Sequence, residues 1–151
     1  MSTTTVAKPE RHWLEQTLTR QIPLGHAMQL TLARLDEVGI ALAAPLAPNV
    51  NDKGTAFGGA LMSMMTLAGW SLPRLVLRRQ DLKAELVIGR CEVRFLTPVS
   101  DDFQALCSWP EADLIQAFIE RLIETGKGKL ELNPRIEING QVAAQLQARY
   151  V

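Results

Sequence analysis

The residues best suited to chemistry lie in one loop, Asn49–Gly59, which leads directly into a long apolar stretch. If that stretch is a helix, its first backbone N–H groups have no partners within the helix, and with the helix dipole they favour negative charge. Gly58 and Gly59 allow another group to approach the backbone closely. Such a place could bind a carbonyl oxygen and stabilise a developing oxyanion. From Gly-Gly alone, a tight turn that needs glycine for steric reasons is the favoured interpretation.

Other catalytic and metal-binding patterns are missing from the sequence. His12 and His26 have neither His-x-x-x-His nor paired Cys/His spacing, so we predict no metal site. The Gly-x-Ser-x-Gly pattern of a serine hydrolase is also missing. Cys91 and Cys107 fall on the apolar faces of predicted strands, so we expect both thiols to pack in the core.

Charge and composition exclude several classes of protein. The 151 residues carry 16 Lys+Arg and 16 Asp+Glu, so the chain lacks the net basic charge that favours binding to nucleic acid. Met1–Glu10 does not resemble a secretory signal, which favours a reduced, cytoplasmic protein. No charged residue lies between Lys53 and Arg74, a length close to the roughly 20 residues of a membrane span. The glycines, hydroxyls and Pro73 in this block instead predict a helix buried inside a soluble protein, with no membrane span.

The surrounding elements predict an α+β fold in one domain over 1–151, with residues 1–8 flexible. An antiparallel sheet of about six strands, wrapped around the buried helix, accounts for the order of the elements. Asn139-Gly140 predicts the tight turn of the last hairpin, because both positions tolerate positive φ. The predicted helices are Pro9–Gln21, 58–77 and Asp113–Thr125. The predicted strands are Leu30–Leu35, Val38–Ala44, Glu85–Leu96, Phe103–Trp109, Leu130–Ile138 and Val142–Tyr150.

The segment Ala44–Gly59, followed by Thr66–Trp70, resembles the YiiD C-terminal domain family of hotdog-fold thioesterases. The resemblance continues through Ile22–Leu24, Phe95–Val99 and the final Tyr150-Val151. It implies a long helix wrapped by an antiparallel sheet, and a homodimer or dimer of dimers with its sites at the subunit interface. Some members follow an acetyltransferase domain, and this chain is expected to be the stand-alone form.

Broader hotdog thioesterases, related to phenylacetyl-CoA thioesterase, carry Asn-x-x-Gly-Thr-x-His-Gly-Gly and then an acidic residue on the helix. The resemblance implies that the Asn positions the water or thioester and that a Gly N–H polarises the carbonyl. It also implies that the acidic residue reaches the site from the other subunit. In this sequence Phe57 stands at the His position and Thr66 at the acidic position, and neither is a ready base. The matching positions are Asn51, Gly54, Thr55, Gly58 and Gly59.

Asp52 is the only carboxylate in the motif. One hypothesis is that Asp52 activates a water for thioester hydrolysis while Asn51 and Thr66 position it; an Asx-type turn within the loop is an equal alternative for Asp52. For the Ser63 hydroxyl, a bond to a helix carbonyl is the favoured alternative to facing the substrate. The expected substrate-binding residues are Asn49, Phe57, Gly58, Gly59 and Ser63.

The sequence therefore favours hydrolysis of an acyl-CoA or acyl-carrier-protein thioester. No cofactor is expected beyond the CoA or phosphopantetheine that forms part of the substrate. A catalytically silent module that binds acyl thioesters or serves assembly is the alternative, and a dehydratase is a third. Arg74, Arg78 and Arg79 could meet the phosphates of CoA, although a solvated helix end is the favoured interpretation.

Overall fold

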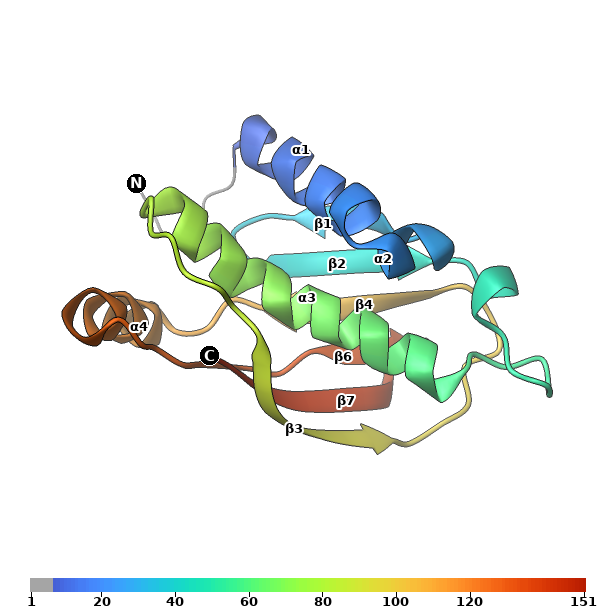
Figure 1. Cartoon of the computed structure of the whole chain (residues 1–151). Coiled ribbons are helices and arrows are strands. Elements are labelled where there is room, and N and C mark those ends of the chain that lie inside the picture. The colour runs from blue at the N-terminus through green and yellow to red at the C-terminus, as the bar shows by residue number, and fades with distance from the viewer. Residues whose placement is uncertain (1–6) are drawn as a thin grey trace.

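The computed structural model describes residues 7–151, which form a seven-stranded antiparallel sheet wrapped around one long helix (Figure 1). The strand order is β1-β2-β4-β6-β7-β3, and the short β5 pairs with β7. The helices are α1 (Lys8–Gln16), the π-helix η1 (Thr17–Gln21), α2 (Pro23–Ala27), the 3₁₀-helix η2 (Ala47–Asn49), α3 (Gly58–Arg79) and α4 (Ala112–Thr125). The strands are β1 (Thr31–Leu35), β2 (Gly39–Ala44), β3 (Ile88–Phe95), β4 (Phe103–Ser108), β5 (Leu130–Leu132), β6 (Arg135–Ile138) and β7 (Gln141–Tyr150).

The helix α3 lies in the core, as its charge-free sequence predicts. The sheet packs along one side of it, and the N-terminal helices run beside it (Figure 1). By length and composition α3 could cross a membrane, but 67% of its most apolar window is buried inside the structure, so it is a core helix. At its middle the Tyr150 hydroxyl donates a hydrogen bond to the Thr66 carbonyl over 2.7 Å. Gly69 makes this approach possible, because a Cβ there would lie 2.5 Å from the Tyr150 oxygen.

The turns follow the local sequence signals. Asn139 and Gly140 have φ angles of 52° and 79°, which confirms the predicted hairpin between β6 and β7. Gly126 ends α4 in the left-handed conformation with φ of 73°. Pro134 interrupts the predicted strand Leu130–Ile138 and divides it into β5 and β6, which raises the strand number from about six to seven.

The edge strand β3 corrects the prediction for Cys91. Its alternation is right, because Cys91, Val93 and Phe95 pair with β7 residues of the core. Cys91 is nevertheless exposed, because β3 is the last strand of the sheet and the described residues leave its helix-facing side largely uncovered. Cys107 on the central β4 is buried as expected, and burial raises the pKa of its thiol to about 12.

Residues 1–6 lie outside the described part of the chain, and with them most of the flexible segment predicted over 1–8.

Candidate active site

The loop before α3 is held in shape by Asn51. Its Oδ1 accepts hydrogen bonds from the N–H groups of Lys53 and Thr55, at 2.9 and 3.1 Å, and its Nδ2 donates to the Thr55 hydroxyl over 2.8 Å. The turn reverses at Gly54, whose φ is 82°. Asn51 thus makes the Asx-type turn that the sequence had offered for Asp52. The Asp52 carboxylate is exposed and has no hydrogen bond to the described residues.

Asn49 joins the loop to the start of α3. It is 4% exposed, and its Nδ2 donates to the carbonyl oxygens of Met28 and Pro45 at 3.0 and 2.8 Å. Its own carbonyl accepts the N–H of Phe57 over 2.7 Å. With its amide nitrogen engaged in this way, Asn49 mainly fixes the position of the helix N-terminus.

The N-terminus of α3 presents unpaired backbone donors. The first N–H groups with partners are those of Ala60 and Leu61, which both donate to the Phe57 carbonyl at 2.9 and 3.1 Å. Among residues 7–151, the N–H groups of Gly58 and Gly59 have no acceptor. Two free donors at a helix N-terminus are a suitable site for a carbonyl oxygen that becomes negatively charged.

The two glycines differ in their surroundings. A Cβ on Gly59 would lie 2.3 Å from Cε1 of Phe57, so the ring occupies the space above this residue. A Cβ on Gly58 would lie 3.7 Å from the Phe95 ring, which is an ordinary contact. In its present position the Phe57 ring would therefore overlap a methyl group at 59, whereas packing leaves room for a methyl group at 58.

A cavity of about 320 Å³ opens beside Gly59, between α2, η2 and the first turns of α3. Four of the predicted substrate-binding residues line it: Asn49, Phe57, Gly59 and Ser63. The remaining walls are largely apolar and include Leu24, Ala27, Met28 and Val50. Larger hollows lie elsewhere, one of about 1130 Å³ around Gln104 and Glu137, but none of the predicted site residues line it.

The hydroxyl groups of α3 are engaged differently. The Ser63 hydroxyl donates to the Gly59 carbonyl over 2.8 Å, as the favoured alternative predicted, although the residue also lines the cavity. The Thr66 hydroxyl, one turn further along the half-buried face, has no hydrogen bond to the described residues. Thr66 therefore retains a hydroxyl that is free to bind water or substrate.

The structure thus brings four of the five predicted substrate-binding residues to one cavity, without Gly58, and leaves the predicted catalytic residues outside it. Asp52, Asn51 and Thr66 do not line the cavity of their own chain, and their catalytic roles remain predictions. The sequence reasoning missed the short helix α2, which supplies one wall of the cavity through Leu24 and Ala27. Pro23 at its first turn was a usable signal for a helix start.

Comparison with known proteins identifies the family and the fold. The model of the family described as "Putative thioesterase (yiiD_Cterm)" matches residues 11–151. The crystal structure of a "putative thioesterase from Shewanella oneidensis" has 26% sequence identity and a TM-score of 0.83, and the alignment covers 95% of this chain and 97% of that one. A Chlorobaculum tepidum protein of unknown function has 23% identity and a TM-score of 0.90, with 99% and 97% covered. The E. coli PaaI protein, from the phenylacetic acid degradation operon, has 14% identity and a TM-score of 0.66, with 99% and 94% covered. These likenesses confirm the hotdog fold.

Proposed function

The chain belongs to the YiiD C-terminal thioesterase family, and from this membership we propose that it hydrolyses an acyl-CoA or acyl-carrier-protein thioester in the cytoplasm. One observation carries the proposal. Gly59 lines an apolar cavity, and its free N–H group follows that of Gly58 at the start of α3, so a thioester carbonyl could accept hydrogen bonds there while its acyl group is buried. The volume of about 320 Å³ is at the low end of ligand cavities, roughly 300–1,000 Å³, which favours a short acyl or aryl group.

The reaction needs a water molecule and no cofactor. In the proposed mechanism Asp52 accepts a proton from the water as its oxygen attacks the thioester carbon, and Thr66 and Asn51 position that water. The carbonyl oxygen becomes an oxyanion held by the two glycine N–H groups. When the tetrahedral intermediate collapses, the carbon–sulfur bond breaks and the thiolate takes up the proton, which leaves a carboxylic acid and a thiol.

A homodimer formed along β3 would bring the separated groups together. The free edge of β3 carries unpaired strand groups, and Phe95 and Leu96 are 52% and 49% exposed. Pairing of this edge with a second copy would cover these side chains and place Thr66 of one subunit near the cavity of the other. The change Phe95→Lys should convert a particle of about twice 16.7 kDa into a monomer, as measured by light scattering. The matched change Ile123→Lys, at a 63% exposed position on α4, should leave the dimer intact. A wild-type monomer would contradict the dimer proposal.

One observation favours the alternative of a silent binding module. Neither a carboxylate nor a histidine lines the cavity, so binding without hydrolysis is chemically reasonable. The two functions differ in whether the thiol is released after the acyl thioester binds.

The proposed function is tested by release of free thiol from a panel of acyl-CoA substrates. We expect turnover of short-chain substrates by wild type, and a large loss in Ser63→Leu, because leucine would fill the cavity. The change Gln116→Leu, on the exposed side of α4, serves as the control and should retain activity. No hydrolysis of any thioester by the wild-type dimer would refute the enzyme proposal, and binding of the same substrates would then support the silent module. If activity is present, an unchanged rate in Asp52→Asn would remove Asp52 from the mechanism.

A further inference from the structure

A second cavity, of about 530 Å³, lies at the opposite end of α3 from the proposed thioester site. It is bounded by α1, the last turns of α3 and the segment that follows α3. Trp13, Arg74, Arg78 and Lys83 line it, so an indole lies among three cationic side chains. None of these residues takes part in the proposed hydrolysis.

The two arginines are held in place without forming salt bridges to the described residues. The guanidinium carbons of Arg74 and Arg78 each lie 5.1 Å from the centre of the Trp13 ring, within the range of about 6 Å for cation–π contact. In the part of the chain that the structure describes, neither has a carboxylate within 4.0 Å. The remaining residues, 1–6, contain no Asp or Glu. Both guanidinium groups therefore keep their hydrogen-bond donors for a ligand.

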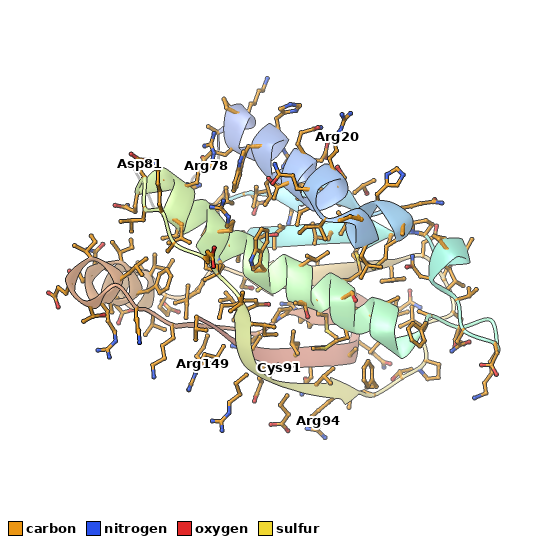
Figure 2. All side chains as sticks on the ribbon, viewed as in Figure 1. Arg20, Arg78, Asp81, Cys91, Arg94 and Arg149 are labelled. Carbon is orange, nitrogen blue, oxygen red and sulfur yellow. The ribbon has the colours of Figure 1, made fainter. Side chains whose placement is uncertain are left out.

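The charges of this cavity select the kind of ligand. Asp81 and Glu85 also line it, and the helix C-terminus by itself disfavours an anion. Figure 2 shows Asp81 and Arg78 at this end of α3. A weakly charged ligand would gain little binding free energy from this cavity. A phosphate ester has the charge density and the oxygen geometry that two planar guanidinium groups can bind together.

The position of this cavity relative to the thioester site suggests which phosphate ester it takes. Gly59, Ser63, Thr66, Trp70 and Arg74 follow one another at spacings of three or four residues, and all are half-buried, so they lie on one face of α3. From Gly59 to Arg74 the face extends for about 22 Å at about 1.5 Å per residue. CoA carries its thioester and its phosphates at opposite ends of the flexible pantetheine arm.

We propose that the cavity lined by Trp13, Arg74, Arg78 and Lys83 binds the phosphate-bearing nucleotide end of CoA. The proposal rests on the proposed function in that it takes acyl-CoA as the substrate. It adds the residues that would recognise the carrier.

Calorimetric titration with CoA and with adenosine 3′,5′-bisphosphate tests the binding step. Both should bind the wild-type protein, and the double variant Arg74→Gln/Arg78→Gln should weaken binding at least tenfold, or about 1.4 kcal/mol. Lys83→Gln should also weaken binding. This variant should leave the packing of α1 unchanged, because Lys83 makes no cation–π contact with Trp13. The control Arg20→Gln, at an exposed position of η1 (Figure 2), should bind as wild type does. Equal affinity in all of these proteins, or inorganic phosphate binding as tightly as the nucleotide, would overturn the proposal.

Kinetics with two substrates separate this proposal from the proposed function. In Arg74→Gln/Arg78→Gln the KM for acyl-CoA should rise at least tenfold, while the KM for the same acyl group on pantetheine should not change. Hydrolysis of acyl-CoA with an unaltered KM in the variant would refute the nucleotide site and leave the thioesterase function standing. Arginine-dependent binding of CoA by a protein without any hydrolytic activity would refute the thioesterase function and support the nucleotide site.

Discussion

Replacing Gly59 by alanine tests whether the position of the Phe57 ring controls the proposed site. The new Cβ would lie 2.3 Å from Cε1 and 2.9 Å from Cζ of that ring. Carbon atoms in favourable contact are about 3.5 Å apart, so the ring must move by roughly 1 Å. Because Phe57 is 56% exposed, the ring can swing outward, and the stability of the fold should change little. The displaced ring is a wall of the cavity that Gly59 also lines.

We therefore expect Gly59→Ala to lower kcat/KM for acyl-CoA, with little change in the midpoint of thermal unfolding. A misplacement of about 1 Å can cost about 100-fold in rate, so a loss of roughly 10- to 100-fold is expected. The neighbouring change Gly58→Ala is the matched control, because its Cβ would meet the Phe95 ring at 3.7 Å. That variant should retain activity within about twofold of wild type, since packing leaves the methyl group room.

Equal activity in the two alanine variants would refute the reasoning, because only one of them moves the ring. A further check uses Phe57→Ala. If ring displacement is the cause, Gly59→Ala should have almost no additional effect once the ring has been removed. Full additivity of the two changes would instead show that the methyl group acts through the backbone.

Three further predictions concern the framework of the site. Gly69→Ala should lower the free energy of unfolding, measured with denaturant, by about 1–3 kcal/mol, because its methyl group would overlap the Tyr150 hydroxyl. The loss should be smaller in a Tyr150→Phe background, and an unchanged loss would exclude that overlap. Asn49→Ala should cost about 1–3 kcal/mol by leaving buried carbonyl groups without a donor, and a neutral result would contradict the anchoring role. Burial raises the pKa of Glu10, but hydrogen bonds from Arg79 and the Ala7 N–H, with the nearby positive charges, outweigh it and lower that pKa below 4.5. The stabilisation from Glu10 is thus complete above pH 4.5 and is lost as the pH falls further, so wild type should lose more unfolding free energy in acid than Glu10→Gln; parallel pH curves would contradict this.

The elements that could be predicted from the sequence are those with a local cause. The absence of charge from Lys53 to Arg74 marks α3 because a core helix excludes charged groups on every side. Asn139-Gly140 marks the last hairpin because the turn requires positive φ at both residues. In each case the determining interactions lie within a few residues of each other.

The details that could not be predicted depend on distant contacts. The alternating pattern assigned Cys91 to the correct face of β3. Whether that face is covered depends on the position of β3 in the sheet, which is set by pairing with β7 at the far end of the chain. The amide of Asn49 is engaged by the Met28 carbonyl, 21 residues earlier, which no motif spacing reveals. The wall of the cavity formed by Leu24 and Ala27 likewise becomes visible only when α2 is placed beside α3.

The division of the candidate site within one chain has a consequence for how activity could arise. The proposed carbonyl-binding groups, the N–H groups of Gly58 and Gly59, both belong to one chain, whereas Thr66 lies about 10 Å further along the helix axis, at about 1.5 Å per residue. A rigid helix cannot bring these two parts together, and Asp52 is exposed to solvent. In the proposed dimer, a second copy across β3 would present its own α3 to this cavity, and one interface would then account for both the free Thr66 hydroxyl and the uncovered β3 face. If the proposed dimer forms, we therefore expect hydrolysis to depend on it, whereas binding of a thioester carbonyl by the N–H groups of Gly58 and Gly59 should not.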